Sequence, residues 1–303
     1  EAQIEARTLM LATNNVFSPA NGRPIMAPTQ DIVLGCYYLT VTGPGTYETV
    51  TDSEGRDISK AFATLLEVFQ AWGEKKVKTH QRIKVRIPDR TIVDERGEHA
   101  LGTGLIETTV GRVLFDDILP AGMPFYNRAL KKRALSDVIV DCNKRLGLQA
   151  TLKLLDDLKD LGFKASTMAG LSFGKGDMRM PKRKASILES AQKEVEAVEV
   201  RREEGAITEK ERYNQVIDIW SHAREAVGKE MMEELKVDRR PGENYVNPIY
   251  LMADSGARGS IDQIRQLAGM RGLMAKPSGE IIETPIISNF KEGLTVLEYF
   301  NST

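Results

Sequence analysis

Cysteine and histidine are scarce in this chain of 303 residues. The two cysteines, Cys36 and Cys142, lie far apart in the sequence. They form neither a disulfide framework nor a metal-ligand spacing, and are expected to be buried, small apolar side chains in a reducing cytoplasm. His80, His99 and His222 are equally scattered, without the spacing of metal ligands. The sequence therefore predicts no zinc and no other metal ion held by its own residues.

An excess of one charge and long apolar runs are also missing. The 42 basic and 43 acidic residues give a net charge of −1, which argues against a general electrostatic attraction to nucleic acid. Any phosphate contact must therefore come from a local cluster. No apolar run reaches the length of a membrane span, and no signal peptide opens the sequence. The composition, 41% hydrophobic and 28% charged, is that of an ordinary soluble protein with one large domain or two to three smaller ones.

Residues 1 to about 180 are expected to mix helices and strands. The apolar run 32–39, interrupted by Gly35, is typical of a strand, as are the stretches 83–87 and 109–114. A hairpin or loop is expected near residues 95–97. Helices are predicted over 1–14, 58–72, 130–146 and 150–161, the last two ended by Gly147 and Gly162.

Residues 184–237 have a different pattern. Apolar residues recur every three or four positions on both sides of a break near Gly205, which is the seam pattern of a coiled coil. Gly205 can end the first helix, and Thr208 with Glu211 forms a capping box for the second. The two helices must then fold back on each other as an antiparallel hairpin with charged outer faces that projects into solvent. A plain helical spacer is an equally good interpretation of the pattern.

Glycine and arginine alternate between Ala253 and Pro277. The segment GARGS, residues 256–260, places Arg258 between two glycines and ends at Ser260, which can cap a following helix. Glycine lets the backbone approach a ligand closely, and the arginine fork suits phosphate. This pattern indicates a contact with a phosphate-bearing ligand. From the residues alone, a buried structural role for Arg258 is the stronger interpretation.

Long strings of this sequence closely resemble the largest (β′) subunit of bacterial multisubunit RNA polymerase. The similar stretches occur in the family's order and cover most of the chain, with residues 43–78 the least similar part. They are LMLATNNVFSPANGRPIMAPTQDIVLGCYYLT (9–40), ETTVGRVLFDDILPAGMPFYN (107–127), ERYNQVIDIWSHA (211–223), the glycine–arginine segment (253–277) and ETPIISNFKEGLTVLEYFNST (283–303). The family's NADFDGD signature, which holds the catalytic magnesium, does not occur. Both ends of the chain look cut, so a piece of a longer polypeptide is expected.

The resemblance implies an α+β fold: a mixed pore domain with a projecting antiparallel coiled-coil hairpin. The implied layout is the end of the active-site domain (1–20), the pore domain (21–183), the rim-helix hairpin of the funnel (184–237), an F-loop and funnel segment (238–285) and the start of the bridge helix (286–303).

The resemblance also implies roles for particular residues. Arg258 and Gln30 would contact the substrate, whereas Gln30 alone would read as a polar loop residue. Arg265, Gln266, Arg271 and Met274 would belong to the F-loop and support the active centre. Each of them singly is equally well explained as a helix-surface residue or a core methionine. Partner binding at the hairpin tip would involve Glu203, Glu204, Gly205 and Thr208. No catalytic residue is expected in this chain.

The implied function is DNA-directed RNA synthesis as part of a multisubunit nucleotidyltransferase, in which this chain forms the secondary channel for nucleotide entry. Magnesium would be held by residues outside the chain. Implied partners are the β, α, ω and σ subunits, template DNA, RNA, nucleoside triphosphates and Gre-type transcript cleavage factors at the rim helices, with no membrane and a location in the cytoplasm at the nucleoid. Two other classes stay open: a non-catalytic scaffold with a helical hairpin, and a free-standing phosphate-ligand enzyme built around GARGS.

Overall fold

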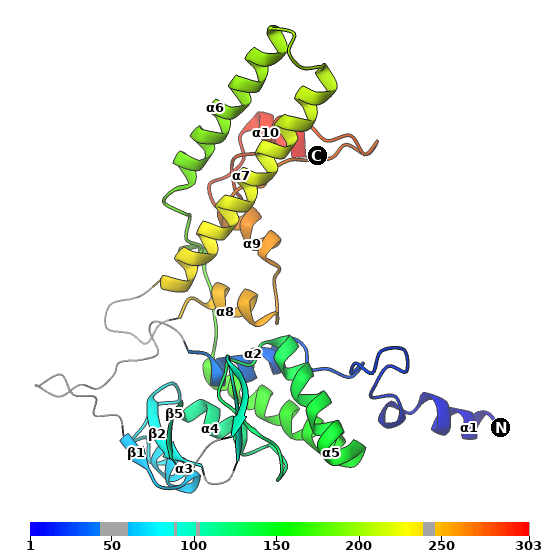
Figure 1. Cartoon of the computed structure of the whole chain (residues 1–303), viewed down its shortest axis with the longest axis vertical. Coiled ribbons are helices and arrows are strands. Elements are labelled where there is room, and N and C mark those ends of the chain that lie inside the picture. Colours follow the sequence, from blue (N-terminus) through cyan, green and yellow to red (C-terminus); the bar gives the residue numbers. More distant parts are fainter. Residues whose placement is uncertain (43–59, 88–89, 101–103, 239–245, 303) are drawn as a thin grey trace, which may run out of the picture. The chain divides into compact units, whose positions relative to one another are not determined.

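The computed structural model describes residues 1–42, 60–87, 90–100, 104–238 and 246–302. The chain forms two compact units. Unit 1 comprises Glu1–Leu171, Arg240–Val246 and Asp254–Arg258, and unit 2 comprises Ser172–Arg239, Asn247–Ala253 and Gly259–Thr303. Figure 1 shows the elements along the chain. Helices accompany two small sheets, as the predicted α+β class requires.

The strands of unit 1 form two three-stranded sheets. In one, β2 (Arg82–Arg86) pairs in parallel with β1 (Lys60–Phe62) and antiparallel with β5 (Leu105–Thr109). In the other, β3 (Thr91–Asp94) pairs antiparallel with β4 (Gly97–Ala100) and in parallel with β6 (Phe125–Tyr126). The β3–β4 turn confirms the hairpin predicted near residues 95–97. Strand β2 confirms the strand predicted over 83–87.

The helices of unit 1 include a chain of short turns at the amino end and four longer elements. They are α1 (Ala2–Glu5), the π-helical turn Ala6–Met10, the 3-10 turn Ala12–Asn14, α2 (Gln30–Thr40), α3 (Leu65–Gly73), α4 (Val110–Asp116) and α5 (Lys132–Ala169). The helix predicted over 58–72 is therefore shorter than expected and is preceded by strand β1. Residues 58 and 59 lie outside the described part of the chain.

The strand predicted over residues 32–39 is wrong, because these residues form helix α2. The helix is buried on nearly every side, so it has no polar face, and a short apolar run of this kind cannot be told from a buried strand by its periodicity. Gly35 permits a close helix crossing: a Cβ atom on it would lie 2.0 Å from the backbone oxygen of Gly162 in α5.

Two further boundaries differ from the predictions. Strand β5 ends at Thr109, whose Oγ1 accepts a hydrogen bond from the backbone N–H of Arg112 and so begins helix α4 where a strand was expected. Gly162 does not end a helix, since α5 continues to Ala169 and ends at Gly170, which has a φ of 54°. Gly147, with a φ of 81°, does interrupt α5 as predicted.

Two apolar clusters form the core of unit 1. One packs the sheet residues Ile83, Val85 and Ile106 against α3 and α4, and the other packs α2 against α5. Cys36 and Cys142 are buried and unpaired, which confirms their prediction as small core residues. None of the helices in the described residues has the length and apolar character needed to cross a bilayer.

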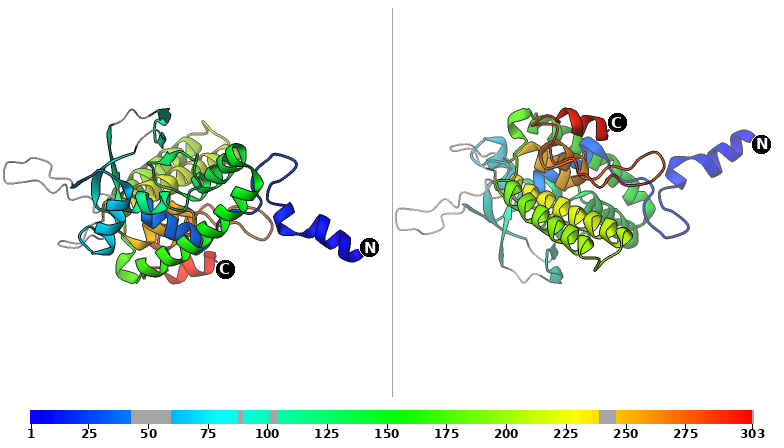
Figure 2. Two further views of the ribbon diagram at one scale, coloured as in Figure 1. Left: turned by 90° about the horizontal axis from the view of Figure 1, so that it is seen from below. Right: turned by 90° about the horizontal axis from the view of Figure 1, so that it is seen from above.

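Unit 2 is built around the antiparallel pair α6 (Lys184–Glu203) and α7 (Glu209–Val237), which lie side by side in all three views (Figures 1 and 2). Ala191, Val198, Val216, Trp220 and Ala223 are buried between them, as the seam pattern predicted. The remaining helices are the 3-10 turn Lys175–Asp177, α8 (Pro248–Ser255, shared with unit 1), α9 (Ile261–Ala268) and α10 (Val296–Ser302). The hairpin predicted for residues 184–237 is confirmed.

Candidate functional site

The GARGS segment is a sharp bend between two helices. Helix α8 ends at Ser255, and Gly256 and Gly259 follow with φ angles of 73° and 80°, a backbone region that favours glycine. Ser260 caps α9, because its Oγ accepts a hydrogen bond of 3.2 Å from the backbone N–H of Gln263. The predicted cap is therefore confirmed.

Arg258 is exposed and forms no ion pair or hydrogen bond with any residue that the structure describes. The interpretation of Arg258 as a buried structural arginine is thus wrong. Flanking glycines on both sides leave the guanidinium on the outside of a bend, where it can meet a ligand. Such a group offers five N–H donors in a planar fork that matches phosphate oxygens.

An unpredicted anchor holds the chain next to this bend. The carboxylate of Asp254 accepts a hydrogen bond of 2.5 Å from the Tyr37 hydroxyl of α2 and one of 2.7 Å from Lys131 Nζ, just before α5. All three residues belong to unit 1. These partners are 217 and 123 residues away in sequence, so no local pattern identifies them.

Gln30 is the first residue of α2 and is exposed. Its φ of 49° is unusual for a residue other than glycine. No hydrogen bond joins it to Arg258 among the described residues. The structure thus brings both side chains to the surface of unit 1 without linking them to each other.

The four residues assigned to the F-loop lie in unit 2, where two make side-chain contacts and two accept backbone hydrogen bonds. Arg265 is 7% exposed and pairs with Asp262, which contradicts its interpretation as a helix-surface arginine. The Arg271 guanidinium lies 4.9 Å from the centre of the Phe290 ring. The backbone oxygens of Gln266 and Met274 accept hydrogen bonds from the N–H groups of residues 290 and 282.

The segment of residues 271–286 folds back on itself. Isolated bridges join Gly272 to Ile286 and Ala275 to Ile281, and the turn between them is closed by the Gly279 N–H to the Lys276 oxygen. Residues 281–286 therefore pair with the preceding chain through single bridges and form no regular strand in the described structure.

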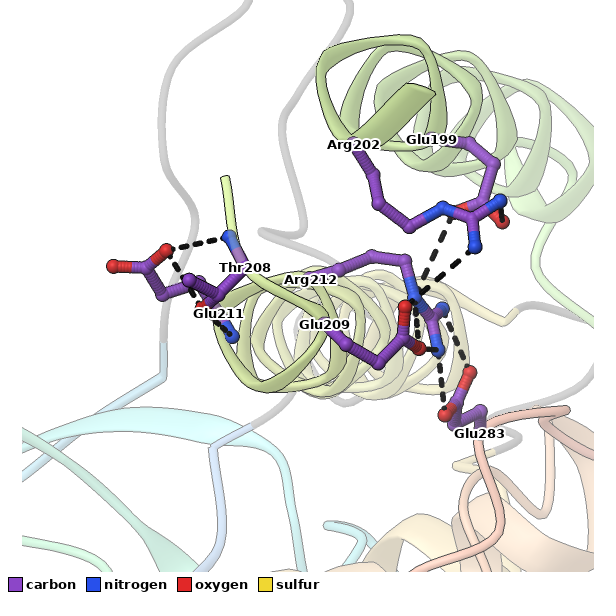
Figure 3. Close-up of polar contacts among 7 residues, drawn as sticks. All are labelled: Glu199, Arg202, Thr208, Glu209, Glu211, Arg212 and Glu283. Atoms are coloured by element: carbon purple, nitrogen blue, oxygen red, sulfur yellow. Dashed lines mark hydrogen bonds and ion pairs between the residues drawn. The ribbon is translucent and has the colours of Figure 1, made fainter. Parts of the chain in front are cut away.

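The tip of the hairpin carries exposed acidic side chains. Glu203 and Glu204 end α6, and Gly205 follows with a φ of 74°. Thr208 and Glu211 form the predicted capping box: the Glu211 carboxylate accepts 2.8 Å and 2.9 Å hydrogen bonds from the N–H and hydroxyl of Thr208 (Figure 3). These bonds lower the pKa of Glu211, so its charge is retained in moderate acid.

Arg212, which sequence reasoning did not single out, organises the region just behind the tip. Its guanidinium forms a two-bond pair of 2.8 Å and 2.9 Å with Glu283 and also contacts Glu209 and Glu199 (Figure 3). The hydrogen bonds with Glu283 and Glu209 raise the pKa of Arg212. The hydroxyl of neighbouring Tyr213 donates to the Ile281 oxygen and accepts from the Ile281 N–H, at 3.1 Å and 3.2 Å. Two adjacent residues of α7 therefore fasten the folded-back segment.

No group of three or more His, Cys, Asp or Glu side chains capable of holding a metal occurs among the described residues. The adjacent acids Asp116 and Asp117 do not form such a site. The Asp116 carboxylate instead accepts hydrogen bonds of 2.7 Å and 2.8 Å from Arg90.

Two family models match the chain. The models of RNA polymerase Rpb1, domain 3 and RNA polymerase Rpb1, domain 4 match residues 15–178 and 207–291. The chain belongs to the Rpb1 family of RNA polymerase subunits, as the resemblance to β′ subunits indicated.

Similar proteins are named DNA-directed RNA polymerase subunit beta'. That of Rhodopirellula baltica is 52% identical over all of this chain and 21% of its own length. Those of Aquifex aeolicus and Hydrogenovibrio crunogenus are 49% and 47% identical over all of this chain and 18% and 21% of theirs. The chain thus spans about a fifth of the length of these relatives.

Proposed function

We propose that this chain forms the pore and rim-helix part of a bacterial β′ subunit and lines a secondary channel through which nucleoside triphosphates reach the active centre. Membership in the Rpb1 family supports a role in a multisubunit RNA polymerase. The observation that supports the local role is Arg258 itself, which is exposed, pairs with no described residue and lies on a bend between two glycines of positive φ. The activity of the whole enzyme would be template-directed RNA synthesis, carried out with the β, α, ω and σ subunits on DNA in the cytoplasm.

Arg258 would bind the triphosphate of the incoming nucleotide. In this reaction the 3′ hydroxyl of the transcript attacks the α-phosphate of the nucleotide, and magnesium ions held outside this chain stabilise the developing charge. The guanidinium of Arg258 would add a planar, two-bond contact to phosphate oxygens and orient the substrate. Gln30 would be a second polar contact. Neither residue takes part in bond making.

The folded-back segment of residues 271–286 would support the active centre from unit 2. Arg265, Gln266, Arg271 and Met274 would fix the shape of this segment through the contacts described above. A stable loop of this kind can guide the closing motion that positions substrate.

The hairpin tip would receive Gre-type transcript cleavage factors. Glu203 and Glu204 give it an exposed acidic surface, and the bend at Gly205 and the cap at Thr208 set its shape. Such a surface suits a partner with basic groups at the contact.

The substrate role of Arg258 is tested by Arg258→Ala in the assembled polymerase. We expect the KM for the incoming nucleotide to rise about tenfold, because a hydrogen bond to a charged group contributes about 1.5–3 kcal/mol. Arg258→Lys should recover part of the loss. The control is Arg96→Ala, an exposed arginine in the β3–β4 turn. Unchanged single-nucleotide addition by Arg258→Ala would remove Arg258 from the substrate site.

The role of the tip is tested by deleting residues 199–211. Basal RNA synthesis should persist, whereas factor-stimulated transcript cleavage should be lost. The double variant Glu203→Lys/Glu204→Lys should weaken factor-stimulated cleavage without shortening either helix. The control Glu189→Lys/Glu194→Lys, which lies nearer the start of α6 and away from the tip, should leave factor-stimulated cleavage unchanged. Normal factor-stimulated cleavage by the deletion variant would contradict the tip as the docking site.

A further inference from the structure

A cavity of unit 1 lies beside the end of helix α3. Its volume is about 710 Å³. Arg258 does not line it. The residues that do are mainly aromatic and basic: Tyr38, Trp72, Lys75, Val77, Lys78 and His80. A cavity of several hundred Å³ is large enough for a small organic ligand.

Lys75 adopts a backbone conformation that glycine would adopt with less strain. Helix α3 ends in a Schellman motif, in which the N–H of Lys76 bonds the Ala71 oxygen and the N–H of Lys75 bonds the Trp72 oxygen, both at 2.9 Å. Lys75 occupies the left-handed position of this motif with a φ of 58°. Strained residues of this kind are concentrated at functional sites, so an observed strain supports a role for the side chain.

The two lysines of the cavity are electrically uncompensated. Neither Lys75 nor Lys78 forms a side-chain hydrogen bond or ion pair with any of the described residues, and no acidic residue lines the cavity. By contrast, their neighbour Lys76 pairs with Glu74 at 2.5 Å. The cavity therefore presents two free ammonium groups to an anion.

Hydrogen bonds hold the aromatic walls in place. The rings of Tyr38 and His80 meet edge to face with centres 4.5 Å apart, and His80 Nε2 donates to the Tyr38 backbone oxygen at 2.6 Å. The Trp72 indole N–H donates to Thr79 Oγ1 at 3.3 Å. Burial lowers the pKa of His80, so its ring is a neutral wall at pH 7. Fixed rings reduce the entropy lost when a flat ligand binds.

We propose that this cavity binds a nucleotide, with its base against the ring of Tyr38 or Trp72 and its phosphate on Lys75 and Lys78. Stacking on aromatic side chains together with lysine contacts to phosphate is the way proteins hold unpaired nucleotides. The ligand is either a free nucleotide or one nucleotide of a single-stranded RNA. This site is separate from the substrate contact proposed for Arg258 and does not depend on it.

The test is ultraviolet cross-linking of the assembled polymerase to a radiolabelled nucleoside monophosphate and, separately, to a short single-stranded RNA, with the cross-linked peptides mapped by mass spectrometry. We expect label on the peptides that contain Tyr38 or Trp72. Label from the monophosphate alone identifies a free nucleotide as the ligand, and label from the RNA alone identifies a strand.

The decisive variant is Lys75→Gly, which relieves the backbone strain and removes the charge. It should unfold at the same temperature as the wild type or higher, yet lose at least tenfold of the cross-linking. Lys78→Ala should lose cross-linking as well, and the control Lys76→Ala should not. Two results would overturn the proposal: full cross-linking by Lys75→Gly, or no label in the wild type. If the wild type takes no label, chemical cross-links from Lys75 to an acidic segment of another subunit would show that a protein covers the cavity instead.

Discussion

Replacing Gly35 by alanine should destabilise unit 1 by about 2 kcal/mol. The new Cβ would lie 2.0 Å from the Gly162 oxygen, 2.8 Å from its carbon and 2.9 Å from the Ser166 nitrogen. These are backbone atoms of α5, which cannot rotate away as a side chain can. Overpacking typically costs about 1–3 kcal/mol of stability. Because the atoms that the new Cβ would meet are backbone atoms, we expect a cost at the upper end of this range. The higher helix propensity of alanine offsets about 1 kcal/mol of this cost.

The chain contains two tryptophans, which allow the two units to be followed separately. Trp72 lies in unit 1 and Trp220 in unit 2. In a Trp220→Phe background, tryptophan fluorescence during thermal unfolding reports unit 1. A loss of about 2 kcal/mol corresponds to a midpoint lower by about 4–8 °C in a unit of this size. In a Trp72→Phe background, which reports unit 2, the midpoint should not change.

The matched control is Gly73→Ala at the end of α3, where a Cβ would meet no atom within 4 Å. This variant should be neutral or slightly more stable. The close backbone crossing of α2 and α5 at Gly35 is refuted if Gly35→Ala unfolds at the wild-type temperature while the Gly73 variant behaves as expected.

Two further predictions concern unit 2. A double-mutant cycle of Arg212→Ala and Glu283→Ala should give a coupling free energy of about 1 kcal/mol in urea unfolding. The reason is that two hydrogen bonds join the pair and the Arg212 side chain is only 12% exposed. The control is the exposed pair Lys193–Glu189, whose coupling free energy should be near zero. Equal couplings would show that Arg212 does not fasten the segment. Burial would raise the pKa of Glu298, but hydrogen bonds from Ser288 and Thr295 outweigh it and lower the pKa from 4.5 to about 2. The stabilisation is therefore complete above pH 4.5 and is lost as the pH falls through about 2, so the unfolding midpoint should fall more steeply below pH 4.5 in the wild type than in Glu298→Gln. Parallel pH profiles would contradict this role.

The hairpin and its caps could be predicted because their determinants are local. The Thr208–Glu211 capping box and the Ser260 cap each involve residues three positions apart, and Gly205 sets its own turn. The seam of α6 and α7 is amphipathic, since one face of each helix meets the other and the opposite face meets water.

Helices α2 and α4 were mistaken for strands because burial removes that contrast. Val33, Cys36 and Leu39 of α2 and Val110 and Val113 of α4 are all buried, and most of their neighbours are buried too. A helix surrounded by core shows no polar face, so its periodicity carries little information about its conformation.

The sequence by itself determined the family, the α+β class, the helical hairpin, its caps and the glycine–arginine bend, since these depend on residue identity and on contacts a few positions apart. Only the tertiary structure decided that Arg258 is exposed, that Asp254 anchors its segment to Tyr37, and that Arg212 meets Glu283. Such partners are up to 217 residues apart in the chain. Their pairing follows from how the whole chain closes on itself, which no short pattern records.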